Sequence, residues 1–349
     1  MGLPVYRIEL KDSAMKKLES NIWSDSFVSG TMSMDGRRTP IRIRYRGGHT
    51  REYPKKSYEI RTAKATYHFN AEHDDPSLMR NALSFHYFNV LGVPSPSTKH
   101  CVLYMNGKKE GVYLRIEAVK SAFFRKRGLH ARSIIYAVND NADFAMPEKN
   151  AKSSRLLSGY AFIKGGETDR NRLSDFIRSI NRKKGTDLSD YLRQRLDIDN
   201  YLRWLCGAVL TGNYDGFLQN YTIFEYGKRN KYGMIPWDYE GTWGRNCYGK
   251  AVNSDLVRIK GYNVLTGKVL AYKANRQKYK RILERALEST FTVSRLMPVV
   301  RKMHSAIAQD IYDDPKYKWD VGIFDTEPDV IREYIEDRRR DIKNEMEQL

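Results

Sequence analysis

The sequence has few cysteines and no long apolar run, and these two shortages exclude several classes of protein. Its three cysteines, Cys101, Cys206 and Cys247, are widely spaced and odd in number, which fits reduced thiols better than a disulfide framework or a zinc site. No apolar stretch approaches the roughly 20 residues that a transmembrane helix needs. The first residues lack the basic-then-apolar order of a secretory signal peptide. We therefore expect a chain without a membrane partner that folds where it is made.

Acidic residues are also in short supply. Lys and Arg number 61 against 42 Asp and Glu, which gives a formal net charge of +19. This excess favours anionic partners such as nucleic acid, an acidic surface or a nucleotide. The basic residues are spread along the chain with local clusters, and a solvated basic face explains them more readily than a dedicated polyanion groove. Because no zinc finger, helix-turn-helix or RNP-type aromatic motif accompanies the charge, a nucleic-acid partner is not favoured.

The first third of the chain alternates apolar and polar residues, as half-buried strands do. Asp35-Gly36 and Asn106-Gly107 are turn dipeptides between such runs and predict two hairpins. Residues 55–62 resume the alternation, and residues 74–92 predict a helix that Asp75 caps, with Pro76 in its first turn. Three strands, a helix and two more strands form an α+β lobe of roughly 115 residues.

Two neighbouring lysines precede the apolar residues of the third strand, in "KKSYEIRT". Side chains alternate between the two faces of a strand. Lys56 therefore shares a face with Tyr58 and Ile60, whereas Lys55 shares the other face with Glu59 and is expected to point to water. This pattern makes Lys56 the candidate for a functional lysine.

Beyond Glu117 the pattern is mostly helical. A short helix is expected to end at Gly128, and the polar stretch near 137–158 is typical of loops. Residues 170–212 have helical spacing, with an apolar stripe predicted to be buried. The stripe consists of Leu202, Leu205, Cys206, Val209 and Leu210, and amphipathic helices are expected around 265–287, 293–312 and 328–347.

Three polar residues follow the long helix, where two short strands interrupt the helical pattern. Asp215 and Asn220 lie between Gly212 and the strand at 221–226, and Asp238 follows the next strand. Because a tight hairpin returns the chain to where it left, the three residues should converge. Phosphoryl transfer needs mainly positioning and charge neutralisation, for which carboxylate and amide oxygens are suited, including as Mg²⁺ ligands. Protein kinases use the same order of Asp-x4-Asn, hairpin and metal-binding Asp.

The same residues also have plainer interpretations, and several kinase landmarks are missing. Asp215-Gly216 could form a turn, and Asp238 could cap a loop. Lys56 could lie at a strand edge and extend its ammonium group into water. The sequence has no G-x-G-x-x-G over the first hairpin and no His-Arg before Asp215, and D-Y-E-G replaces D-F-G. A standard eukaryotic-type kinase is excluded. A divergent kinase-like fold of two lobes, 1–117 and 118–349, is the expected architecture.

Several motifs, in order, closely resemble the spore coat protein H (CotH) kinase family of spore-forming bacteria. They are "IRIRYRGGHTREYPKKSYEI", "LYMNGKKEGVYLRIEAV", "GNYDGFLQNYTIF" and "IPWDYEGTWG", and the resemblance extends from about residue 30 to past 260. It implies an atypical, Mg-dependent Ser/Thr protein kinase, with Mn²⁺ as an alternative metal, that uses ATP to phosphorylate spore coat proteins. It also implies a role in coat assembly and germination, and hence a location in the spore coat.

The resemblance also implies roles for individual residues. Asp215 would be the catalytic residue, and Asn220 and Asp238 the metal ligands. Lys56 would pair with the ATP phosphates. The stretch from Arg46 to Arg51 would take the place of the missing glycine-rich loop. Glu117 and Ala118 would lie at the hinge and contact adenine.

Three other functions remain open from the sequence. A basic nucleic-acid-binding protein would show salt-dependent binding with Asp215 and Asp238 dispensable. A structural coat scaffold would keep a kinase-like shape without turnover. A transferase of the same fold could instead attach AMP to its substrate.

Overall fold

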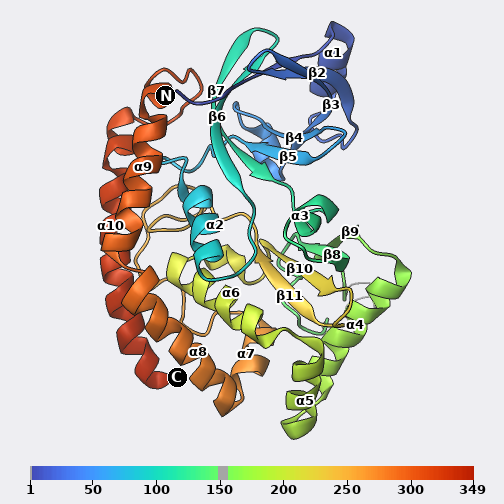
Figure 1. Cartoon of the computed structure of the whole chain (residues 1–349), viewed down its shortest axis with the longest axis vertical. Helices are drawn as coiled ribbons and strands as arrows, with labels where there is room; N and C mark the ends of the chain where they lie inside the picture. The colour runs from blue at the N-terminus through green and yellow to red at the C-terminus, as the bar shows by residue number, and fades with distance from the viewer. Residues whose placement is uncertain (1, 148–155) are drawn as a thin grey trace. The chain divides into compact units, whose positions relative to one another are not determined.

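The computed structural model describes residues 2–147 and 156–349, and the chain divides into two compact units (Figure 1). Unit 1 comprises the chain up to Ala82 together with residues 96–118 and 298–329. Unit 2 comprises residues 83–95, 119–297 and 330–349. Helices and sheets are both present, so the predicted mixed α+β class is confirmed. Among the helices described, none is both long and apolar enough to traverse a lipid bilayer.

Unit 1 is built on a closed barrel with the strand order β1-β2-β3-β4-β5-β7-β6 (Figure 1). Neighbouring strands are antiparallel, except that β1 and β6 pair in parallel and close the barrel. Its interior holds buried apolar side chains that include Ile43, Ile60 and Leu103. The strands are β1 (Val5–Glu9), β2 (Val28–Met34), β3 (Arg37–Arg46), β4 (Ser57–Arg61), β5 (Thr66–Asn70), β6 (Thr98–Met105) and β7 (Lys108–Glu117), and helix α1 (Asp12–Ser20) follows β1.

Both predicted hairpins are present. Asp35 and Gly36 have φ of 50° and 75°, and Asn106 and Gly107 have φ of 47° and 81°. Two successive positive φ angles are those of a type I′ turn, whose twist matches that of the flanking strands. The turn chemistry therefore sets the β2–β3 and β6–β7 pairings locally.

The helix predicted from residue 74 starts later than expected. Helix α2 extends from Arg80 to Val90. Asp75 and Pro76 lie in the preceding turn, so the prediction that Pro76 occupies the first turn of the helix is wrong, although the Asp75 carboxylate does accept from the first helical amide. The reason lies in the backbone: Leu78 has φ of +53°, outside the helical region, and a carboxylate oxygen of Asp75 accepts from the Arg80 amide across that turn at 2.8 Å.

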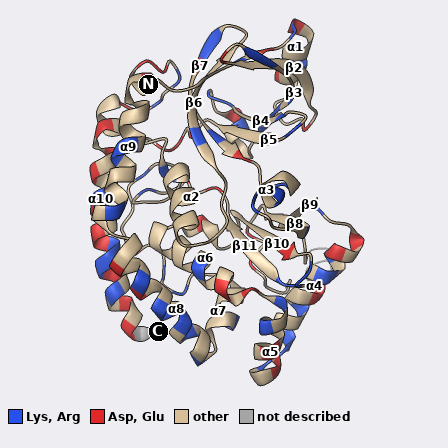
Figure 2. Cartoon of the chain, viewed as in Figure 1, with Lys and Arg blue, Asp and Glu red and all other residues tan. Residues whose placement is uncertain are grey.

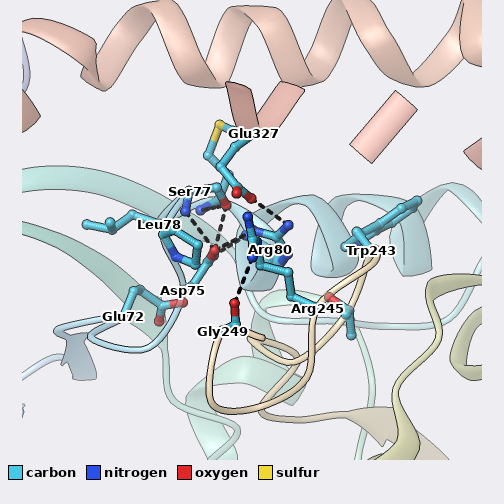
Figure 3. Close-up of polar contacts among 12 residues, drawn as sticks. Glu72, Asp75, Ser77, Leu78, Arg80, Trp243, Arg245, Gly249 and Glu327 are labelled. Atoms are coloured by element: carbon cyan, nitrogen blue, oxygen red, sulfur yellow. Dashed lines mark hydrogen bonds and ion pairs between the residues drawn. The ribbon is translucent and has the colours of Figure 1, made fainter. Parts of the chain in front are cut away.

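A buried ionic network in unit 1 surrounds the first residue of α2. The Arg80 guanidinium is 0% exposed and lies 2.6 Å from carboxylate oxygens of both Asp75 and Glu327, which are equally buried. Figure 3 shows the Arg80 side chain between these two partners. Glu327 belongs to α10 (Val321–Glu345), so the network attaches a C-terminal helix to an N-terminal turn.

Unit 2 combines an antiparallel sheet, in the order β11-β10-β8-β9, with several helices. The predicted buried stripe of α6 is confirmed, since its five residues are 0% exposed. Gly212, with φ of +75°, ends that helix as expected. The elements are α3 (Ser121–Lys126), β8 (Ala131–Ala137), β9 (Tyr160–Lys164), α4 (Glu167–Arg182), α5 (Gly185–Arg195), α6 (Ile198–Thr211), β10 (Tyr221–Tyr226), β11 (Tyr232–Pro236), α7 (Val264–Leu270) and α8 (Lys273–Arg285).

Some boundaries in this half of the chain differ from the sequence prediction. The helix expected at 265–287 is two helices, α7 and α8, and α10 begins well before residue 328. Helix α9 (Val293–Tyr312) agrees with its predicted range. Of the predicted loop near 137–158, residues 148–155 lie outside the described part of the chain.

Candidate active site

The β10–β11 hairpin of unit 2 brings Asn220 and Asp238 to the same end of the sheet. Tyr221 is paired with Pro236, and the Trp237 amide donates to the Asn220 carbonyl oxygen at 3.2 Å. Asn220 and Asp238 both have left-handed φ angles, 58° and 59°. Backbone of this kind is uncommon outside glycine and is enriched at functional sites. The hairpin therefore juxtaposes the two residues as the sequence predicted.

The turn that carries Asp215 is attached to Asp238 through Asn213. Asp215 lies in a single 3₁₀ turn, Tyr214–Gly216, directly after α6. The buried Asn213 side chain donates to the Asp238 carbonyl oxygen at 3.3 Å, and the main-chain carbonyl oxygen of Asn213 accepts from the Gly216 amide at 3.3 Å. Asn213 thus links the turn that carries Asp215 to the main chain of Asp238, a link that the sequence did not predict.

Cys247 is a second neighbour that the sequence analysis missed. Burial, the negative charge of Asp215 and a hydrogen bond to its carboxylate together raise the pKa of the Cys247 thiol to about 12. Gly241, the glycine of D-Y-E-G, makes room for this segment, because a Cβ there would lie 2.6 Å from the Cys247 amide nitrogen. A lone cysteine nine residues beyond Asp238 carries no sequence signal for such a contact.

Alkylation of Cys247 tests this contact without any enzymatic assay. In Asp215→Asn the charge that opposes thiolate formation is gone, so the Cys247 pKa should fall. At pH 8 we expect roughly tenfold faster alkylation, the effect of one pKa unit on the thiolate fraction. The other two cysteines are buried and should stay unmodified in the folded chain. Asp255→Asn is the matched control, and an unchanged rate in Asp215→Asn would refute the contact.

Two stacked aromatic rings adjoin the candidate metal ligands. The rings of Tyr136 on β8 and Trp237 are 5.4 Å apart at 24°. Trp237 directly precedes Asp238 and is 8% exposed, and the Tyr136 hydroxyl donates to the Val119 carbonyl oxygen at 3.0 Å. This pair fixes the backbone that leads into Asp238 by packing against β8.

In unit 1 the predicted orientation of Lys55 is wrong. Lys55 is 2% exposed, and its ammonium lies 2.8 Å from the Asp314 carboxylate. Burial lowers the pKa of Lys55, and the charge of Asp314 opposes that shift. Strand β4 begins only at Ser57, so the alternation of a strand does not reach the two lysines. Lys56 is partly exposed, and its ammonium donates to the Arg51 carbonyl oxygen at 2.6 Å.

The arginines of unit 1 that the family motif singles out are both engaged in the barrel. Arg51 is nearly buried and donates to the Gly47 carbonyl oxygen at 2.9 Å and to the Asp25 carboxylate at 2.8 Å. Arg46, at the end of β3, donates to the Asn70 side chain. Arg51 therefore holds the turn after β3 in place, and an ATP-binding role for either arginine stays a prediction.

Glu117 and Ala118 end the last barrel strand. The Glu117 carboxylate accepts from the Ser97 hydroxyl at 3.1 Å, and its amide donates to the Ser97 carbonyl at 2.9 Å. The Ala118 amide donates to the Thr66 carbonyl at 3.2 Å. Both amides are thus engaged within unit 1, and the predicted adenine contact stays a prediction.

The candidate metal ligands fit magnesium in their donor chemistry. In the part of the chain that the structure describes, no three His, Cys, Asp or Glu side chains gather closely enough to enclose a metal. Asn220 and Asp238 offer one amide and one carboxylate. Mg²⁺ takes such hard oxygen donors in small number and completes its shell with water and phosphate oxygens. The pair therefore suits an ion that a phosphate substrate helps to hold.

Comparison with known proteins establishes the family. The family model described as CotH kinase protein matches residues 43–342, so the chain belongs to this family. Inner spore coat protein H of Bacillus subtilis (strain 168) is 40% identical over 355 residues, which cover 99% of this chain and 98% of that protein. The inner spore coat protein H-like protein of the same strain is 28% identical over 292 residues, covering 82% of this chain and 83% of that protein.

Solved structures are more distant. The proinflammatory kinase CtkA of Helicobacter pylori aligns with a TM-score of 0.36 and 11% identity, covering 83% of this chain and 92% of that one. HipA of Shewanella oneidensis MR-1, from its complex with HipB and operator DNA, aligns with a TM-score of 0.37 and 14% identity. The alignment covers 95% of this chain and 71% of that chain. TM-scores this low do not establish a shared fold, and the kinase-like arrangement of two lobes stays a prediction.

Proposed function

We propose that this chain is an atypical protein kinase of the spore coat, which transfers the γ-phosphate of ATP to Ser or Thr hydroxyls of coat proteins. Membership of the CotH kinase protein family over most of the chain carries the proposal. The curated relatives named as inner spore coat proteins support the location and the substrate class. The β10–β11 hairpin, which has Asn220 and Asp238 at its two ends, and the hydrogen bond from Asn213 near Asp215 to Asp238 support the chemistry.

Each residue has a definite role in the proposed reaction. The acceptor oxygen forms a bond to the γ-phosphorus, the bond from that phosphorus to the bridging β,γ-oxygen breaks, and ADP leaves. Asp215 orients the acceptor hydroxyl and takes its proton. Asn220 and Asp238 hold Mg²⁺, which neutralises phosphate charge when bound. Lys56, more accessible than Lys55, pairs with the phosphates.

The decisive experiment identifies the group transferred. The purified chain is incubated with ATP, Mg²⁺ and spore coat proteins, and the products are analysed by mass spectrometry with and without EDTA. We expect increments of about 80 Da per modified Ser or Thr, abolished by EDTA and restored by Mg²⁺ or Mn²⁺. An increment equal to AMP would indicate nucleotidyl transfer, and unchanged coat proteins in the presence of bound ATP would indicate a scaffold.

A further inference from the structure

The positive charge of unit 2 is concentrated in one segment. Residues 258–285 contain nine Lys and Arg but a single acidic residue, Glu284. The segment comprises α7, α8 and the residues before them, and Figure 2 shows Lys and Arg along α8. Helices α4 and α5 are also rich in Lys and Arg, but there acidic residues are interspersed with the basic ones.

Most of these side chains have no carboxylate partner. Lys278 pairs with Asp199 at 2.7 Å, and Arg276 donates to main-chain oxygens, including that of Leu270 at 2.9 Å. By contrast, Arg172 elsewhere in unit 2 pairs with the buried Glu225. Besides Arg258 and Arg276, six residues of the segment make no ion pair with any residue that the structure describes. We call them the basic surface: Lys260, Lys268, Lys273, Lys280, Arg281 and Arg285.

An open groove adjoins the basic surface. Its volume is about 440 Å³, and Lys260 and Arg276 line it together with the apolar Leu270 and Ala271. Gly267 also lines it, and a Cβ there would meet no atom within 4 Å, so the groove has room at this point. The lining of the groove combines basic and apolar residues, a combination that a polypeptide can contact with both its polar and its apolar groups.

The segment begins beside the turn that carries Asp215. The Arg258 guanidinium lies over the Tyr262 ring at 5.1 Å, and that ring packs edge-on against Tyr214 at 5.2 Å. Asn263 donates to the Phe217 carbonyl oxygen at 3.1 Å. A ligand on the basic surface would therefore continue toward the candidate catalytic turn within the same unit.

We propose that the basic surface binds phosphorylated segments of protein, the product of the reaction proposed above, on which this inference rests. Each phosphoserine adds a charge of about −1.5 to −2 and three acceptor oxygens, for which unpaired Lys and Arg are suitable partners. A segment retained in this way presents its neighbouring hydroxyls to Asp215, so that sites close together in one substrate are modified in succession.

A protein ligand fits this surface better than a nucleic acid. Binding of single strands relies on aromatic rings on which bases stack. In this segment Tyr279 is buried, the Tyr262 hydroxyl donates to the Leu256 carbonyl oxygen at 2.6 Å, and that of Tyr272 donates to Gly185 at 2.6 Å. None of the three rings is among the exposed large side chains of the described residues.

Binding of a synthetic peptide tests the proposal. A labelled peptide with three phosphoserines, its serine form and its glutamate form are titrated into the full chain without ATP. We expect the phosphorylated form to bind best and to weaken as salt is added. In Lys273→Glu with Arg281→Glu, affinity should fall roughly 100-fold, since losing a hydrogen bond to a charged group costs about tenfold. Lys273→Gln with Arg281→Gln should give an intermediate loss.

The matched control changes the net charge equally at other exposed positions of unit 2. Arg178→Glu with Lys228→Glu should alter affinity by no more than about twofold at moderate salt. Equal affinity for the phosphorylated and serine peptides, equal loss in the control, or tighter binding of a single-stranded oligonucleotide would each overturn the proposal. Because the titration needs no turnover, an inactive chain that still binds the phosphopeptide would refute the proposed kinase reaction only.

Discussion

Replacement of Asp215 by Asn should lower the rate of phosphoryl transfer by about 10³-fold, within the range for loss of a general base. The amide keeps the size of the side chain but cannot take the proton of the attacking hydroxyl. Since Asp215 is not proposed to hold the nucleotide, the KM for ATP should change little. The measurement is the initial rate of label transfer from γ-labelled ATP to coat proteins, at saturating Mg²⁺ and over a range of ATP concentrations.

A second substitution separates proton acceptance from metal binding. Asp238→Asn removes a carboxylate ligand, so its loss of rate should diminish as Mg²⁺ is raised, whereas that of Asp215→Asn should not. Asp255→Asn, which changes the charge equally at an exposed position of unit 2, should retain wild-type activity. Full activity of Asp215→Asn in a folded chain would remove this residue from the proposed reaction.

Replacement of Arg80 by Met should destabilise unit 1 by about 3–5 kcal/mol, the cost of leaving buried charges without their partner. The Met side chain fills much of the space, but Asp75 and Glu327 would stay buried without the cation that neutralises them. The free energy of unfolding is measured from urea titrations that monitor unit 1. An effect of this size would reduce the folded-to-unfolded ratio by more than a hundredfold.

An exposed arginine of the same unit provides the control. Arg38 pairs with Glu9 on the barrel surface, where the two side chains are 62% and 54% exposed. Solvent screens this pair, so Arg38→Met should cost less than about 1 kcal/mol. Adding Glu327→Gln to Arg80→Met should restore part of the stability, because one of the two unpaired charges is then removed. Equal losses for Arg38→Met and Arg80→Met would contradict a buried ionic network.

The features that the sequence predicted well are those that depend on near neighbours. The Asp35-Gly36 and Asn106-Gly107 turns tolerate positive φ, and this local property sets the pairing of the strands on either side. The stripe of α6 follows from apolar residues at helical spacing, which can be buried together only on one face. The hairpin between Asn220 and Asp238 is likewise present, as the short spacing of its two strands predicted, whereas the roles of Asp215, Asn220 and Asp238 stay predictions.

The features that the sequence did not predict depend on contacts between distant segments. Strands β1 and β5 are five residues each and are recognised only through their partners in the closed barrel. Cys247 carried no signal of its contact with Asp215. The start of α2 was misplaced because a left-handed Leu78 precedes it, which residue type alone does not indicate.

By itself the sequence determined the family, the mixed α+β class and the set of residues from which phosphoryl transfer can be proposed. Only the tertiary structure decided which charged side chains are buried and which opposite charges they pair with. Lys55 pairs with Asp314, and Arg80 pairs with Asp75 and Glu327. The physical reason is that burying a charge is costly unless an opposite charge arrives with it. Because Asp314 and Glu327 come from the C-terminal helices and the loop between them, a local pattern of alternation cannot reveal them.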